Sequence, residues 1–103
     1  MNRLDSLKAQ LGGPRDGALL RYSLGSALLE AGNTTESIAQ LRAALDFDAG
    51  YSAAWKLLGK ACAQSGDAQA AADAWRHGMA AAETRGDVQA AREMRVFLKR
   101  LGP

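Results

Sequence analysis

The feature that most constrains this chain is an internal repeat with a period of 34 residues. When the sequence is shifted by this period, similar residues align in order across a whole repeat: Leu24 with Leu58, Gly25 with Gly59, Ala27 with Ala61, Gly32 with Gly66, Asn33 with Asp67, Leu41 with Trp75, and Arg42 with Arg76. One shared dipeptide would mean little, but an ordered set of matches at a single shift indicates a structural repeat. Repeat chains fold by stacking small units, each of which buries its apolar face against its neighbours.

The composition indicates that the repeated unit is helical. The 103 residues are rich in Ala and Leu, only 6% of them are aromatic, and there are two Pro. Ala and Leu favour helices, and the scarcity of β-branched and aromatic residues argues against a sheet. The length suits one domain. We therefore predict a single all-α domain over residues 1–103.

Apolar spacing and helix-ending residues divide the chain into capping helices and two repeats. We predict an N-terminal capping helix at residues 2–11, repeat 1 at 18–51, repeat 2 at 52–85, and a C-terminal capping helix at 87–101. Asp16 is predicted to cap the first helix of repeat 1, and Asn33 with Glu36 has the spacing of a capping box for the second. The N-terminal helix is interpreted as a degenerate half-repeat that covers the end of the stack, with a loosely attached tail as the alternative.

Small residues in the helices predict close contacts between them. Gly25 and Gly59 fall in mid-helix, where each costs about 1 kcal/mol relative to Ala. A close approach of the paired helix, which a larger side chain would block, explains why these glycines are present. Ala44 and Gly78 predict the same kind of contact with the following helix.

The last helix does not begin a third repeat. At the positions of the repeat motif it has Gln89, Arg92 and Glu93. Its apolar stripe and its cations are instead those of a terminal helix that covers the stack with one face and keeps it soluble with the other. The stripe consists of Ala90, Met94, Phe97, Leu98 and Leu101, and the cations are Arg92, Arg95, Lys99 and Arg100.

The segment from Trp55 to Gly59 has the W-x-x-L-G pattern that is typical of one repeat family, and Ala71 and Trp75 fit the rest of that pattern. About residues 18–85 thus resemble the tetratricopeptide repeat (TPR) family, in a small two-repeat form with helical caps. Repeat 1 matches less closely, since Arg21 stands where the family often has Trp and Ser37 where it has Ala. The resemblance implies antiparallel helix pairs stacked in a right-handed superhelix. It also implies a protein–protein interaction module, without catalysis, whose concave groove is lined by the first helix of each unit.

On this resemblance, side chains outside the core stripe line the groove. They are Leu19, Tyr22, Ser26 and Leu29 in repeat 1, and Ala53, Lys56, Lys60 and Ala63 in repeat 2. We select Tyr22, Ser26, Lys56 and Lys60 as the candidate peptide-binding residues. The two lysines are four residues apart and share one helix face, where an anionic ligand would relieve their mutual repulsion.

A different role for the lysines stays open at this point. Some TPR domains clamp the terminal carboxylate of a peptide with Lys and Asn side chains. Lys56 matches one such Lys, but Lys60 stands where the Asn is expected, and the third repeat that completes the clamp is missing. The alternative is that both lysines only solvate an exposed face.

The remaining candidate residues point to structure rather than chemistry. His77 is the only histidine and falls outside the core stripe, so we expect a surface residue and no metal site. Cys62 lies on the packed stripe and is predicted to be a small buried hydrophobe. Trp55 and Trp75 occupy repeat core positions, where packing is their expected role. We find no phosphate loop or nucleophile motif, and we predict no cofactor and no enzymatic activity.

Charge and hydropathy limit the partners. The net charge of +2 is mild, whereas nucleic-acid modules concentrate more Lys and Arg on one face. No apolar run approaches the roughly 18 residues of a membrane span, and the N-terminus lacks the apolar region of a signal peptide. We therefore predict a cytoplasmic protein that binds another protein, with neither nucleic acid nor membrane as a partner. The alternative is self-association, because stacks generally need about three repeats for stability and an open end could pair with a second copy.

Overall fold

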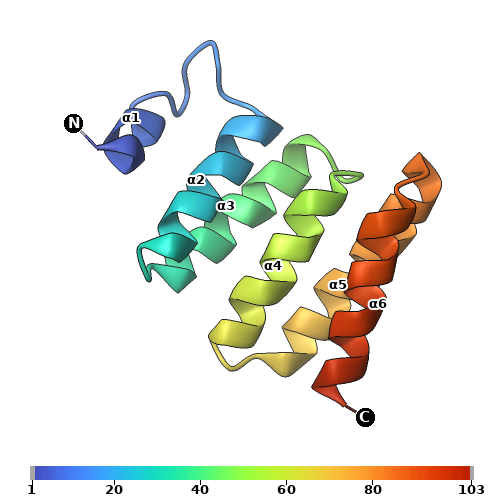
Figure 1. Cartoon of the computed structure of the whole chain (residues 1–103). Coiled ribbons are helices and arrows are strands. Elements are labelled where there is room, and N and C mark those ends of the chain that lie inside the picture. The colour runs from blue at the N-terminus through green and yellow to red at the C-terminus, as the bar shows by residue number, and fades with distance from the viewer. Residues whose placement is uncertain (1, 103) are drawn as a thin grey trace.

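The computed structural model describes residues 2–102, and within them it contains six α-helices and no strand (Figure 1). In chain order the helices are α1 (Arg3–Lys8), α2 (Ala18–Glu30), α3 (Thr34–Phe47), α4 (Ser52–Gln64), α5 (Ala68–Arg85) and α6 (Val88–Leu101). The all-α fold predicted from the composition and the repeat is therefore confirmed.

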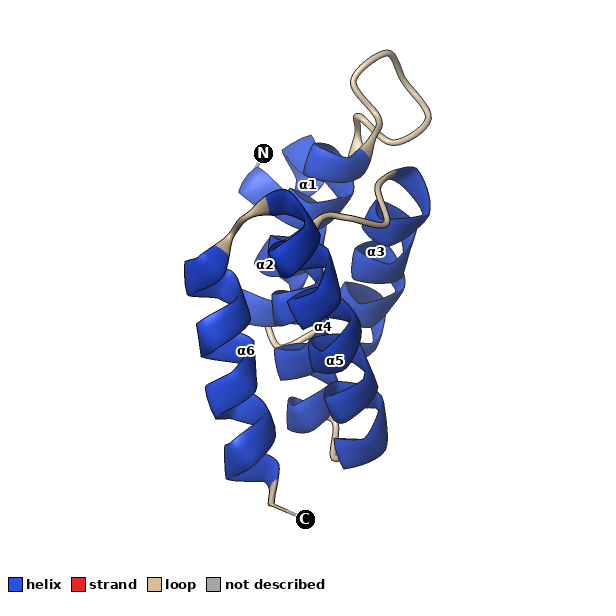
Figure 2. Ribbon diagram, turned by 90° about the vertical axis from the view of Figure 1, so that its right-hand side faces the viewer, coloured by secondary structure: helices blue, strands red, loops and turns tan. Residues whose placement is uncertain are grey.

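The helices form two layers. α2, α4 and α6 lie side by side in one layer, and α3 and α5 lie in the other, as the two perpendicular views show (Figure 1, Figure 2). α2 packs along α3, and α4 packs along α5; α3 also packs on α4, and α5 on α6. The stack is elongated, with principal extents of 42 × 29 × 18 Å. This is the arrangement of stacked antiparallel helix pairs that the TPR resemblance implied.

α1 packs on one end of the stack. It contacts α2, its Leu4 and Leu7 are half-buried, and Lys8 forms a salt bridge of 3.4 Å with Glu36 of α3. α1 is shorter than the helix expected over residues 2–11. After Lys8 the chain continues in tighter turns, and the left-handed Gly12 (φ +77°) then redirects it.

The mid-helix glycines allow the close approaches that the sequence predicted. A Cβ atom on Gly25 would lie 2.7 Å from Cγ of Leu41. At Gly59 the added atom would collide with the indole of Trp75, and at Gly78 it would collide with Met94 of α6. Each glycine thus marks the point where a side chain of the next helix crosses the backbone.

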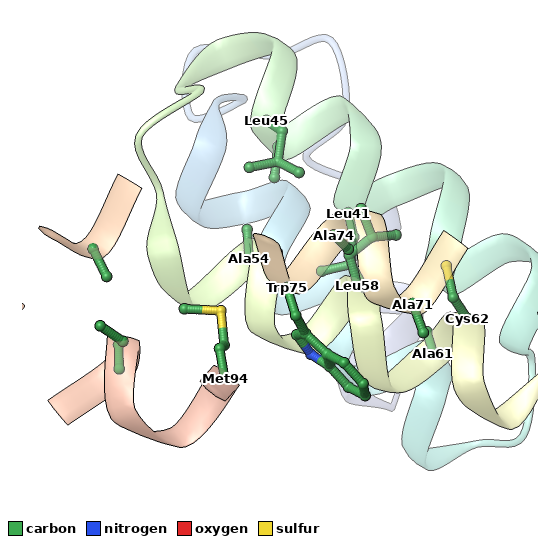
Figure 3. Packing of buried hydrophobic residues seen from close by; sticks show 14 residues of the cluster. Leu41, Leu45, Ala54, Leu58, Ala61, Cys62, Ala71, Ala74, Trp75 and Met94 are labelled. Atoms are coloured by element: carbon green, nitrogen blue, oxygen red, sulfur yellow. The ribbon is translucent and has the colours of Figure 1, made fainter. Parts of the chain in front are cut away.

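The core is continuous from α3 to α6. Figure 3 shows how side chains from these four helices meet in it. Its labelled members are Leu41, Leu45, Ala54, Leu58, Ala61, Cys62, Ala71, Ala74, Trp75 and Met94. Cys62 is only 2% exposed, as predicted, and this burial raises the pKa of its thiol. A buried thiol with a raised pKa is a packing residue rather than a nucleophile.

Ser37 explains one departure from the family pattern. It is the buried polar residue of the core, and its hydroxyl donates a hydrogen bond of 2.7 Å to the backbone oxygen of Gly25. The hydroxyl is therefore satisfied in an apolar setting, and it ties α3 to the point where α2 approaches most closely.

Two predicted helix caps are wrong. α2 begins after Gly17, and Asp16 instead accepts hydrogen bonds from the Gly12 backbone and from Arg21, each at 2.9 Å. Asn33 precedes α3 but makes no side-chain capping bond. Its expected partner Glu36 is engaged by Lys8 across the α1–α3 contact, so the capping box does not form.

Candidate functional site

The four candidate groove residues lie on two neighbouring helices of one layer. Tyr22 and Ser26 are one turn apart on α2, and Lys56 and Lys60 are one turn apart on α4. α6 lies on the other side of α4 in the same layer (Figure 1). The face formed by α2, α4 and α6, called the first-helix face below, therefore includes a helix that our groove prediction left out.

Both lysines turn toward α6. The Nζ atom of Lys56 donates a hydrogen bond of 3.1 Å to the carboxylate of Glu93. This bond, together with the charge of Lys56, lowers the pKa of Glu93 below its usual value. The Nζ atom of Lys60 lies 5.1 Å from the centre of the Phe97 ring, within the range of a cation–π contact.

Glu93 and Phe97 are thus site residues that sequence reasoning missed. They are four residues apart on α6, as Lys56 and Lys60 are on α4, so the two helices present matching pairs one turn apart. Their spacing was available in the sequence. The apolar stripe of α6, however, predicts only a core role for Phe97, and Glu93 stands out in the sequence only as a position where the repeat motif is absent.

Tyr22 and Ser26 do not join the lysines directly. The ring of Tyr22 packs on that of Tyr51, with ring centres 5.1 Å apart and an angle of 35° between planes. Burial raises the pKa of the Tyr51 hydroxyl. Ser26 is half-buried. Beside the charged part on α4 and α6, the first-helix face therefore carries an aromatic pair, made by Tyr22 of α2 and Tyr51 just before α4, with the Ser26 hydroxyl one turn along α2.

Trp55 packs against the core as predicted, but at its edge. Trp75 is a core residue at 4% exposure, as expected, but Trp55 is only half-buried at the edge of the core. Its indole stacks on His77, with ring centres 5.0 Å apart and planes within 15°. Its Nε1 donates a hydrogen bond of 2.8 Å to the Ala49 backbone oxygen. His77 is exposed, as predicted, and its Nδ1 lies 2.8 Å from the Asp73 backbone oxygen.

This aromatic stack borders an open hollow of about 450 Å³ beside the turn between α3 and α4. Arg85 closes one side of the hollow and forms two hydrogen bonds, of 2.6 and 3.1 Å, with the Asp48 carboxylate. The Arg85 hydrogen bonds lower the pKa of Asp48. The pair joins the end of α5 to the turn before α4, so its position indicates a structural role.

Arg21, in the place of the family's Trp, also has a structural role. Its guanidinium pairs with both carboxylate oxygens of Asp16. It also donates a hydrogen bond of 3.2 Å to the side chain of Gln40 and lies 5.8 Å from the centre of the Phe47 ring. The Arg21 hydrogen bonds are the largest of several effects that hold the pKa of Asp16 far below its usual range. Arg21 thus links the loop before α2 to α3, whereas Trp55 packs on His77.

Within residues 2–102, no three His, Cys, Asp or Glu side chains lie close enough together to hold a metal ion. None of the helices in that range has the length and hydrophobicity that a membrane crossing requires.

Comparisons with known proteins agree with this architecture. The tetratricopeptide repeat family model matches residues 6–52 and 22–76. The chain is 44% identical to the TPR repeat-containing protein PA0015 of Pseudomonas aeruginosa, over 95% of this chain and 93% of the relative. It is also 44% identical to protein BPP2914 of Bordetella parapertussis, whose solution structure superposes with a TM-score of 0.84 over 98% of this chain and 88% of that one.

More distant structures share the fold. A tetratricopeptide repeat domain protein of Salinibacter ruber, at 20% identity, has a TM-score of 0.77 over 84% of this chain and 96% of that one. MamA, at 21% identity, has a TM-score of 0.71 over 95% of this chain and 64% of its own. The 34-residue period, the glycines that admit crossing side chains, the two-layer stack and these matches together show that the chain belongs to the tetratricopeptide repeat family.

Proposed function

We propose that this protein binds a segment of a partner protein across the first-helix face, with Tyr22, Ser26, Lys56 and Lys60 among the contacts. TPR domains are protein–protein interaction modules and are generally not enzymes. The proposal therefore assigns no catalytic step and no cofactor to the chain. It places the protein in the cytoplasm, as the sequence analysis expected.

The observation that carries the proposal is the Lys56–Glu93 pair on this face. The side chains of Lys56 and Glu93 remain 27% and 36% exposed, so a ligand can reach the ammonium group. Ion pairs at such exposure contribute little to stability, because water screens them. A carboxylate of the partner segment could therefore replace Glu93 at low cost, and Lys60 one turn away would add a second positive charge.

The aromatic part of the face suits the rest of the segment. Tyr22 offers a ring edge and a hydroxyl, and Ser26 offers a second hydroxyl one turn along α2. Rigid aromatic surface and adaptable hydroxyl groups are common contacts in recognition surfaces. We therefore propose an extended or helical segment that places an acidic residue over α4 and apolar or polar residues over α2.

An affinity pull-down from host lysate tests the proposal. The wild type is compared with Lys56→Ala/Lys60→Ala and with a control, Lys8→Ala/Arg76→Ala, that also removes two cations but lies off this face. We expect a partner that the wild type and the control retain and the Lys56/Lys60 variant loses, with helicity unchanged by circular dichroism. Capture of the same proteins by all three variants would remove the lysines from the binding surface.

Glu93→Gln sharpens the test once a partner is in hand. Because it frees Lys56 without adding a charge, the affinity for an acidic segment should rise several-fold in calorimetry. A fall in affinity would mean that Glu93 itself contacts the partner, and the partner's complementary group would then be basic.

Self-association is the second candidate function, and exposed Leu19 favours it. This side chain is 70% exposed at the start of α2 and borders a hollow of about 250 Å³ together with Leu7 and Leu20. A second copy could cover this apolar end of the stack. Light scattering that finds only monomer at high protein concentration would dismiss this function, and a dimer that Leu19→Ser dissociates would support it.

A further inference from the structure

The outer face of α6 is a second charged surface, at the opposite end of the stack from α1 (Figure 1). The inner face of the helix carries buried Ala90, Ala91 and Met94, which pack into the core. The outer face carries exposed cations and valines at helical spacing, called the basic end face: Val88, Arg92, Arg95, Val96, Lys99 and Arg100.

Positive charge is concentrated on this face. Four cations lie here while the whole chain has a net charge of only +2, so the rest of the chain is net negative. Within residues 2–102, the only ion pair that reaches the face joins Arg95 to Glu83 at 3.8 Å, and both side chains are more than half exposed. Such a pair neutralises little charge, so the face keeps a positive potential.

Exposed valines lie among these cations. Val88 is 58% exposed and Val96 is 43% exposed. They are eight residues apart, about 12 Å along the helix, which is roughly two turns. Covering them with a partner's apolar side chains would remove them from water.

We infer that the basic end face docks an acidic segment of another protein that carries aliphatic side chains. Carboxylates of the segment lie against Arg92, Arg95, Lys99 and Arg100, and its aliphatic side chains cover Val88 and Val96. This site uses a different set of α6 side chains from the Lys56–Lys60 site, whose α6 partners are Glu93 and Phe97.

Other polyanions fit the face less well. A membrane-surface helix inserts large apolar side chains, but Phe97, Leu98 and Leu101 of α6 pack against the core. Nucleic acid would engage the cations through phosphate contacts, and it would leave the two valines without apolar partners. The pairing of cations with aliphatic groups therefore favours a protein segment.

The binding test uses a synthetic helical peptide of Glu, Ala and Leu, with Leu along one side, measured by fluorescence anisotropy at low salt. The test variant is Arg92→Gln/Lys99→Gln. The matched control is Arg3→Gln/Arg15→Gln, which removes two exposed arginines at the far end of the stack. Val88→Ser/Val96→Ser removes the apolar part, and circular dichroism checks that each variant remains folded.

We expect the wild type and the control to bind the peptide alike. The Arg92/Lys99 variant should bind about tenfold more weakly, because salt screens charge–charge attraction least at low ionic strength. The valine variant should bind several-fold more weakly. Equal losses in the test and control variants would overturn the proposal. So would anionic vesicles or a DNA duplex bound as tightly as the peptide with no effect of the valine variant, because the face would then be a general polyanion surface.

Discussion

In the α4–α5 hairpin, the indole of Trp75 lies over Gly59 and donates a hydrogen bond of 3.1 Å to the backbone oxygen of Lys56. In the α2–α3 hairpin, Leu41 lies over Gly25, and the polar link between the helices comes from the Ser37 hydroxyl. The same helix crossing is thus closed once by a large rigid ring and once by a flexible aliphatic side chain with a separate hydrogen bond. The repeat therefore keeps the two helix backbones close in both hairpins, but different side chains pack and hydrogen-bond at the crossing.

The glycine substitutions should separate the two hairpins most clearly. We expect Gly59→Ala to lower the free energy of unfolding by about 3 kcal/mol, because the rigid indole cannot move aside without losing its core packing. Gly25→Ala should cost about 1 kcal/mol, since Leu41 can change rotamer and Ala is the better helix former. Urea unfolding followed by circular dichroism measures both.

Gly17→Ala is the control for these substitutions, because a Cβ there meets nothing within 4 Å. Because Gly17 is the N-cap residue of α2, where Gly is favoured over Ala, the substitution should cost about 0.5 kcal/mol through the cap alone. Equal losses for Gly25→Ala and Gly59→Ala would show that the two crossings are equally rigid and would contradict the comparison.

The polar link of the α2–α3 hairpin gives the next largest effect. Ser37→Ala should cost about 1 kcal/mol, because it removes a buried hydrogen bond while leaving the small side-chain volume nearly unchanged. Ser65→Ala serves as the control, since its hydroxyl bonds the Cys62 backbone oxygen at a more exposed position, at the end of α4. A loss of stability at Ser65 as large as that at Ser37 would mean that burial does not determine how much such a hydrogen bond contributes to the free energy of unfolding.

The helix caps of the two hairpins should differ by a smaller amount. The Asp67 carboxylate accepts a hydrogen bond of 3.0 Å from the Ala70 backbone, whereas Asn33 at the equivalent position makes no such bond. We expect Asp67→Ala to cost about 1 kcal/mol and Asn33→Ala only a few tenths. Thermal unfolding of the two single variants measures the difference, and an equal decrease in Tm would indicate that Asn33 caps α3 in solution.

Much of this comparison could be predicted from the sequence, because the 34-residue period aligns Gly25 with Gly59 and Leu41 with Trp75. The charged contacts of the candidate site could not. Lys56 meets Glu93 at a separation of 37 residues, outside that period, and this contact depends on how α6 is rotated against α4. Asp16 was misplaced for a similar reason. Asp16 stands at a suitable distance before α2 to cap it, but its carboxylate instead accepts hydrogen bonds from Arg21. That contact depends on the fold of the preceding loop, which the spacing of residues does not predict.

The smallest effect should appear in acid, at the Asp16–Arg21 pair that belongs to the α2–α3 hairpin alone. Because the folded-state pKa of Asp16 lies below its unfolded value, the pair stabilises the fold fully above the ordinary carboxyl pKa of about 4. That stabilisation is lost as the pH falls from there toward the lower folded-state pKa. Asp16→Asn should therefore lower Tm at neutral pH and make it less sensitive to pH below about 4. Asp46→Asn, at an exposed position of α3, should leave the acid profile unchanged. Parallel acid profiles for Asp16→Asn and the wild type would mean that the Asp16–Arg21 pair adds nothing to the stability of the folded protein.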